Sequence, residues 1–144
     1  MTVRVERTFE FPVHPERVWE FISDPELRAR PISVVDDFRL DDEAGQEATW
    51  FVKLPIPLLD KTAAVRTRDV ERREPEFVKF VGRSKVMRVT GEHEITPTED
   101  GCTLSNRFVV DGKLPGVERY FKSHLDGELD NLEAAMREYL GLPA

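Results

Sequence analysis

The long segment near the end of the chain, residues 114–141, is the feature that most limits the possible folds. Its sequence is LPGVERYFKSHLDGELDNLEAAMREYLG, and its apolar residues recur at spacings of three and four. This pattern predicts one long amphipathic helix that ends at Gly141. An apolar stripe of this kind has to pack against another element. The rest of the sequence must therefore supply a surface of matching length.

That surface is predicted to be a β-sheet. Residues 3–11, VRVERTFEF, alternate apolar and polar side chains with the period of a strand. Six further segments with strand patterns are separated by turn-forming sequences, and they span residues 34–40, 47–53, 63–73, 77–83, 86–96 and 102–110. The short connections favour antiparallel neighbours. The alternation implies one covered face and one solvated face.

Two short helices are expected between the first and second strands. Pro15 and Pro25 each stand at a helix start, where the missing N–H of proline has no cost. Asp24 is a favourable N-cap for the second helix, which is expected to run to about Arg30. Trp19 in the first helix is expected to anchor the pair to the sheet. The terminal helix is the only predicted element long enough to cover the sheet.

Composition and charge limit the functions open to the chain. Its 144 residues suit one domain, predicted to span residues 1–144. The net charge of −7 argues against general affinity for nucleic acid or for an anionic membrane. No apolar run approaches the roughly 20 residues of a membrane helix, so no stable membrane insertion is expected. The N-terminus lacks the apolar segment of a signal peptide, and a cytoplasmic location is the expectation.

The single cysteine, Cys102, excludes an internal disulfide and a thiolate zinc site. It stands at a predicted strand start, where a packing role is expected.

Three segments carry a resemblance to a known family: FPVHPERVWEFISDPE at residues 11–26, EDGCTLSNRF at residues 99–108, and the long C-terminal helix. By these segments the chain resembles the START-like (SRPBCC) superfamily, in its small single-domain, polyketide cyclase/dehydrase-like branch. The resemblance covers essentially the whole chain. It implies an α+β, helix-grip (Bet v 1-like) fold, in which a seven-stranded curved antiparallel sheet wraps around the C-terminal helix and encloses an apolar cavity. Relatives bind lipids, sterols or polyketides, and some are aromatase/cyclases, so the fold alone does not decide the function.

Glu128 is the most anomalous residue of the terminal helix. At 100° per residue it lies about 20° from Phe121, near the middle of the apolar stripe. A carboxylate on a covered face must be paired, hydrated or protonated. It is either a general acid/base or ligand anchor, or a structural residue that reaches water or pairs with an arginine of the sheet. His124, one turn earlier, joins Glu128 as a predicted catalytic residue only if the protein is an enzyme.

Other residues are predicted to line the cavity because they share a face with apolar neighbours. His93 alternates in phase with Met87 and Ile95, and Asn106 with Leu104. The predicted ligand-binding residues are His93, Asn106, Trp50, Phe80, Met87, Tyr120, Phe121, Leu125 and Glu128. As ordinary core residues they would show the same pattern.

His124 and Glu128 lie at positions i and i+4, and with His93 they invite a metal interpretation. No third nearby ligand has recognisable spacing, so neither a metal nor a cofactor is predicted. The apolar loop LPIPLLDK, residues 54–61, is predicted to be a ligand gate or partner contact, or else a loop folded back on the core.

Three functions therefore stay open. The leading hypothesis is binding, transport or sequestration of a hydrophobic small molecule that is lipid-, isoprenoid- or polyketide-like. The second is a polyketide cyclase/dehydratase-like enzyme in which Glu128 or a cavity histidine moves protons beside a ligand carbonyl. The third is a protein-interaction module. The expected state is a monomer or a homodimer.

Overall fold

Seven antiparallel strands form one sheet, in which the first and last strands of the chain are neighbours. The computed structural model describes residues 2–57, 59 and 61–144. The elements are β1 (Thr2–Phe11), α1 (Pro15–Ile22), α2 (Pro25–Ala29), β2 (Val35–Leu40), β3 (Glu47–Val52), β4 (Ala63–Arg73), β5 (Phe77–Arg83), β6 (Met87–Thr98), β7 (Gly101–Gly112) and α3 (Val117–Leu140). The strand order in the sheet is β1-β7-β6-β5-β4-β3-β2. The predicted helix-grip fold is confirmed, and the strand ends agree with the prediction to within about two residues.

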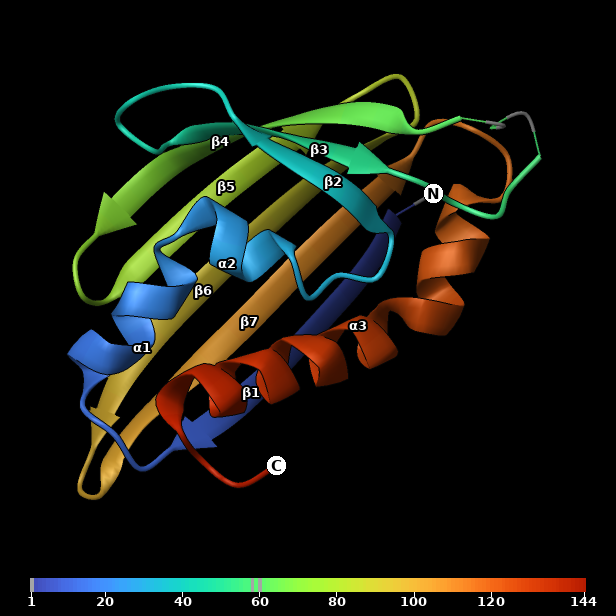
Figure 1. Cartoon of the computed structure of the whole chain (residues 1–144). Coiled ribbons are helices and arrows are strands. Elements are labelled where there is room, and N and C mark those ends of the chain that lie inside the picture. The colour runs from blue at the N-terminus through green and yellow to red at the C-terminus, as the bar shows by residue number, and fades with distance from the viewer. Residues whose placement is uncertain (1, 58, 60) are drawn as a thin grey trace.

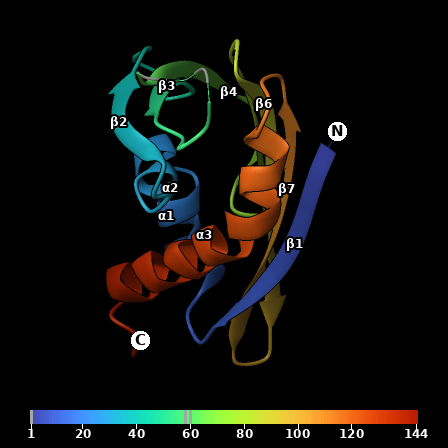
Figure 2. The same cartoon turned by 90° about the vertical axis from the view of Figure 1, so that its right-hand side faces the viewer.

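The sheet curves, and α1, α2 and α3 all lie on its concave side (Figure 1, Figure 2). α3 packs over β1 and β7, α1 packs over β6 and β7, and α2 contacts β2 and β3. The terminal helix is the longest element on this face, as expected, but it shares the covering of the sheet with α1 and α2. The curved sheet is wider than one helix, so the two short helices cover the part that α3 does not reach.

Local sequence explains where the helices begin and end. The Asp24 side chain accepts hydrogen bonds from the backbone N–H groups of Glu26 and Leu27 at 2.9 and 3.2 Å, as the N-cap assignment predicted. α3 starts at Val117, three residues after the predicted 114, because Gly116 adopts a left-handed conformation with φ of 95°. Gly141, with φ of 72°, ends it.

Trp19 is buried in the core, as expected, and its indole N–H donates to Glu74 Oε1 at 3.1 Å. Glu74 lies in the β4–β5 turn, so this bond ties α1 to the sheet. Cys102 is also buried, in the hydrophobic core.

α3 changes direction along its length in both views (Figure 1, Figure 2). Ser123 Oγ–H donates to the Arg119 carbonyl at 3.2 Å. His124 Nδ1–H donates to the Tyr120 carbonyl at 2.8 Å. Side-chain bonds to carbonyls one turn back bend helices, and a glycine at position 127 weakens the same stretch. The bend of α3 thus has its physical cause in the sequence between residues 119 and 127.

Two glycines provide a test of the packing. A Cβ at Gly91 would lie 2.2 Å from Phe80 Cε1, whereas a Cβ at Gly127 would meet nothing within 4 Å. We expect Gly91→Ala to lower the free energy of unfolding by about 1–3 kcal/mol, because the Phe80 ring must leave its place in a packed core. Gly127→Ala, the matched control, is expected to raise it by about 0.5–1 kcal/mol. Urea denaturation measures both, and an unchanged stability of Gly91→Ala would contradict this account.

Candidate functional site

A small apolar cavity lies between the sheet and α3. Its volume is about 40 Å³, and its lining residues are Ile32, Val34, Trp50, Val52, Met87, Val89, Phe108, Val110, Phe121, Leu125, Glu128 and Leu129. This space exceeds the roughly 10–15 Å³ that one water needs, but it is far below the roughly 300–1,000 Å³ of sites for drug-sized ligands. The cavity therefore lies in the expected position but is too small for such a ligand.

The predicted ligand-binding residues divide into two groups. Trp50, Met87, Phe121, Leu125 and Glu128 line the cavity. The other four, Phe80, His93, Asn106 and Tyr120, do not. Phe80 and His93 lie behind the cavity wall, where the Phe80 ring is 5.5 Å from Trp50 and the His93 ring is 5.4 Å from Phe108 between centroids.

Glu128 is buried, and both oxygens of its carboxylate accept hydrogen bonds. Oε1 accepts from the Ser33 backbone N–H and from Asn131 Nδ2, each at 3.0 Å. Oε2 accepts from the Ser33 hydroxyl at 2.9 Å. The carboxylate therefore joins the middle of α3 to the segment between α2 and β2. It pairs with neutral donors of this segment, and not with the sheet arginine that was one of the structural alternatives.

Tyr120 is half-buried against the hydrophobic core, and His124 follows it one turn later in α3. The two rings stack with centroids 4.2 Å apart, and His124 is exposed. Partial burial, and next the negative charge of Glu128, raise the pKa of the Tyr120 hydroxyl. His124 is not part of the cavity wall, so the structure does not bring it beside Glu128 at the cavity.

A buried polar cluster of Arg28, Asp69, His93 and Asn106 stands behind the cavity. Arg28 in α2 forms an ion pair with Asp69 in β4, and the two side chains are 3% and 1% exposed. Arg28 also donates to the Ile22 carbonyl at 3.0 Å. Its Cζ lies 5.0 Å from the centroid of the Phe80 ring.

Sequence reasoning missed Arg28 and Asp69. The segment around Asp69 mixes charges of both signs, a pattern typical of a solvated face. The alternation of side chains along β4 could have identified Asp69 as a buried residue. Asp69 follows Val65 and Thr67 at spacings of two, and all three are buried. Arg28 carried no comparable signal, because helix α2 is only five residues long.

His93 is buried and neutral. Burial, and next the nearby charge of Arg28, lower its pKa from 6.5 to about 3. Its Nδ1 lies 2.8 Å from Asn106 Oδ1. Asn106 Nδ2 donates to the carbonyls of Arg7 and Leu104 at 3.1 and 3.3 Å, which leaves Oδ1 as the acceptor toward His93.

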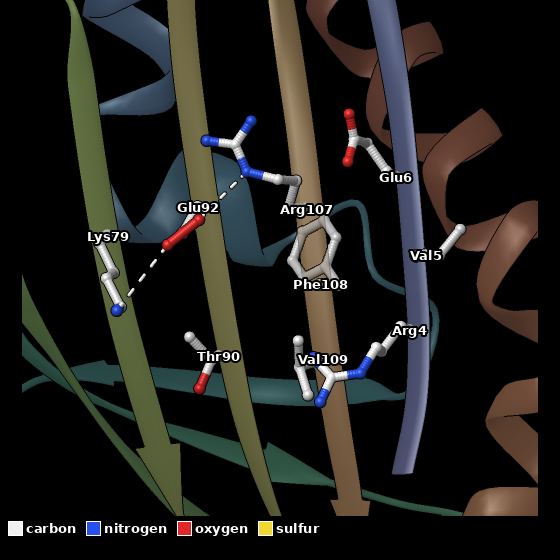
Figure 3. A pocket seen from close by; sticks show the side chains of 9 residues that line it. All are labelled: Arg4, Val5, Glu6, Lys79, Thr90, Glu92, Arg107, Phe108 and Val109. Atoms are coloured by element: carbon white, nitrogen blue, oxygen red, sulfur yellow. Dashed lines mark hydrogen bonds and ion pairs between the residues drawn. The ribbon is translucent and has the colours of Figure 1, made fainter.

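A larger groove of about 580 Å³ lies across β5, β6, β7 and β1 (Figure 3). Its charged residues include Glu92 and Arg107, which alternate with the buried His93 and Asn106 and so stand on the opposite face of the sheet. Glu92 is 3.1 Å from Arg107 and 3.7 Å from Lys79. These charges pair with each other on an open surface, so the groove lacks the apolar enclosure that a hydrophobic ligand requires.

Among the described residues, no group of three or more His, Cys, Asp or Glu side chains is placed to hold a metal ion. Within the same part of the chain, no helix is long and apolar enough to cross a membrane.

The curved sheet, the gripped helix and the cavity between them define a START-like (SRPBCC) domain. Residues 2–137 match the family described as polyketide cyclase / dehydrase and lipid transport. The chain belongs to this family. No protein of curated function matches the sequence.

Solved structures share the fold at low sequence identity. TTHA0849 from Thermus thermophilus is 18% identical with a TM-score of 0.69, over 94% of this chain and 97% of that chain. A START superfamily protein from Mycobacterium smegmatis is 15% identical with a TM-score of 0.71, over 94% of each chain. The di-domain ARO/CYC StfQ from the steffimycin biosynthetic pathway is 12% identical with a TM-score of 0.72, over 96% of this chain and 50% of that chain. At these identities the similarity shows the fold alone.

The contacts of Glu128 make a stability prediction. We expect Glu128→Leu to lower the free energy of unfolding by about 1–3 kcal/mol, because Ser33 and Asn131 lose the acceptor they share. Glu128→Gln keeps Oε1 as an acceptor and is expected to cost less. Urea denaturation of both variants checks this. A Glu128→Leu variant more stable than the wild type would mean that the carboxylate is only a buried liability.

The low pKa of His93 makes a pH prediction. Between pH 6.5 and about 3 the unfolded state binds a proton at His93 that the folded state does not. Stability is therefore complete above pH 6.5 and is lost as the pH falls through this window, by an amount on the order of a few kcal/mol.

His93→Gln cannot be protonated, so its free energy of unfolding is expected to change less than that of the wild type between about pH 7 and about pH 4.5. His124→Gln, at an exposed histidine, is the control and is expected to follow the wild type. Equal pH dependence of all three proteins in urea denaturation would contradict the assignment.

Proposed function

We propose that the protein binds a hydrophobic small molecule, lipid-, isoprenoid- or polyketide-like, in the cavity between the sheet and α3. The observation that carries the proposal is the cavity wall itself, in which eleven of the twelve lining residues are apolar and Glu128 is the exception. Sites for hydrophobic ligands combine such walls with a few placed polar groups. Membership of a family described by polyketide cyclisation and lipid transport supports the same class of ligand.

Binding of such a ligand requires the cavity to expand, because about 40 Å³ is too small for it. The bend in α3 divides the helix into two parts that are held differently. Beyond the bend, Glu128 is bound to Ser33, and Arg137 donates to the Glu10 carbonyl at 3.4 Å. Before or within the bend, Phe121 and Leu125 contribute apolar side chains to the cavity wall. Movement of this first part of α3 is the proposed route of expansion.

The apolar loop between β3 and β4 adjoins the moving part. Leu54 is buried and Ile56 is half-buried against the core. A Cβ at Gly116, the residue before α3, would lie 3.3 Å from Ile56 Cγ2. These residues favour the interpretation of a loop folded back on the core, next to the start of α3. Leu58 and Asp60 of the same predicted gate lie outside the described residues.

A cyclase- or dehydratase-like activity is the second proposal, and the position of Glu128 in the cavity wall is the observation in its favour. Its two oxygens already accept three hydrogen bonds, two at Oε1 and one at Oε2, so only about one lone-pair site, on Oε2, is left to take a proton. The catalytic roles of Glu128 and His124 stay predictions.

Variants that change the size of the cavity test the binding proposal with toluene as the probe. Leu125→Ala enlarges the cavity and is expected to bind toluene more tightly, because less expansion is needed. Val89→Phe fills the cavity and is expected to weaken binding about tenfold. Val70→Ala, at an exposed valine, is the control and is expected to equal the wild type.

Calorimetric or NMR titration gives the affinities of the wild type and the three variants, and native mass spectrometry of the purified wild type is expected to detect an apolar passenger. The proposal is wrong if no passenger is present and toluene binds none of the proteins.

A further inference from the structure

Two buried polar atoms have no hydrogen-bond partner among the described residues. They are Arg28 Nε and His93 Nε2. The two side chains belong to residues that are 5% and 1% exposed. Their other polar atoms are engaged, since Arg28 binds Asp69 and the Ile22 carbonyl, and His93 binds Asn106. A buried donor or acceptor without a partner costs about 1–3 kcal/mol, so two of them in one cluster require an explanation.

The chemical state of His93 Nε2 follows from its neighbours. Both N–H bonds of the Asn106 amide are used by backbone carbonyls, so its Oδ1 faces His93. An amide oxygen only accepts, so His93 Nδ1 carries the proton and donates. In the neutral ring Nε2 therefore carries a lone pair and acts only as an acceptor.

Arg28 supplies the complementary group. Its Nε–H can only donate, because a guanidinium has no acceptor. Arg28 and His93 both contact the Phe80 ring, with Arg28 Cζ at 5.0 Å and the His93 ring at 6.1 Å and 18° to the Phe80 plane. The two side chains are also coupled electrostatically, since the Arg28 charge lowers the pKa of His93. The unpartnered donor and the unpartnered acceptor thus belong to two side chains that contact the same ring.

A hydroxyl group has the chemistry to serve both kinds of atom, since its oxygen can accept from an N–H such as Arg28 Nε–H and its own O–H can donate to a lone pair such as that of His93 Nε2. A ketone or carboxylate oxygen would satisfy only Arg28. An ammonium group would satisfy only His93, and the Arg28 charge would repel it.

We propose that Arg28 and His93 form an internal site that recognises the hydroxyl group of the bound ligand. The inference rests on the proposed function, and it narrows the ligand to apolar alcohols and phenols.

Phe80 separates this site from the cavity. Its ring lies over Gly91, where a Cβ would be 2.2 Å from Phe80 Cε1. Its centroid is 5.5 Å from that of Trp50 and 6.3 Å from that of Phe108, and these two rings line the cavity. The hydroxyl site is therefore one aromatic layer behind the cavity wall. A ligand in the expanded cavity reaches it when the Phe80 ring turns aside.

Phenol and toluene test this site, because they have the same size and differ in one hydroxyl group. Both affinities are measured by titration for the wild type, for His93→Phe and for His124→Phe, which changes the exposed histidine as a control. The ratio of phenol affinity to toluene affinity is expected to fall about tenfold in His93→Phe and to stay unchanged in His124→Phe. A measurement on the wild type needs no variant: the ¹⁵N shift of His93 Nε2 is expected to move with phenol and not with toluene.

Each other outcome overturns the inference in a recognisable way. If both probes bind with the same ratio in all three proteins and the Nε2 shift does not move, the hydroxyl site is wrong and the proposed function stands. If the Nε2 shift already reports a hydrogen bond without ligand and phenol leaves it unchanged, a permanent water is the occupant and the site does not serve a ligand. If neither probe binds any of the proteins, the hydroxyl site and the binding function fail together.

Discussion

The buried ion pair between Arg28 and Asp69 holds together the parts of the molecule that the fold has to combine. Arg28 belongs to a short helix that would be unstable alone, and through this pair and the Ile22 carbonyl it joins α1, α2 and β4. Asp69 also accepts from Arg72 Nη1 at 2.6 Å, so its second oxygen is satisfied. Removal of one partner from such a pair leaves an uncompensated buried charge, which costs about 3–5 kcal/mol. The arrangement of Phe80 and His93 depends on it, because the guanidinium lies against Phe80 and its charge helps to keep His93 neutral.

Glu128 joins the terminal helix to the rest of the molecule, as the ion pair of Arg28 and Asp69 joins the short helices to the sheet. A carboxylate in an apolar stripe is destabilising unless donors surround it, and here the Ser33 segment and Asn131 supply them. Arg7 of β1 adds ion pairs with Asp126 and Asp130 on the solvent side of the same helix. The middle of α3 is therefore fixed to the segment between α2 and β2 and to strand β1 of the sheet. In the turn before it, the side chains of Ser123 and His124 bond to backbone carbonyls one turn back, which bends the helix next to the cavity.

The sequence was sufficient for the fold because the alternation of strands 63–73 and 77–83 and the stripe of the terminal helix depend on local periodicity. It also placed His93, Asn106 and Glu128 on covered faces, where they are buried. It could not find the partners. Arg28 meets Asp69 across 41 residues, and Ser33 meets Glu128 across 95, so these contacts follow from tertiary packing and leave no periodic signal. The size of the cavity has the same origin, because it depends on how side chains from several segments fill the space together.

The small cavity and the two unpartnered atoms are both features of the protein without ligand, and under the proposed function both would change when a ligand binds. A protein that must expand before it binds loses apparent affinity in proportion to the fraction of molecules in the competent form. A ligand can offset this loss of affinity only through interactions that the protein does not already make without ligand. Apolar contact in the cavity supplies part of this difference, but Trp50, Phe80 and Phe108 already pack well against each other without a ligand. Arg28 Nε and His93 Nε2 are unsatisfied in the closed form, so a hydroxyl that reaches them gains hydrogen bonds that nothing in the described part of the closed protein provides. Under the proposed binding function, the polar cluster behind the cavity wall would favour the expanded form for hydroxylated ligands, whereas a purely apolar ligand would gain no such hydrogen bonds to offset the cost of expansion.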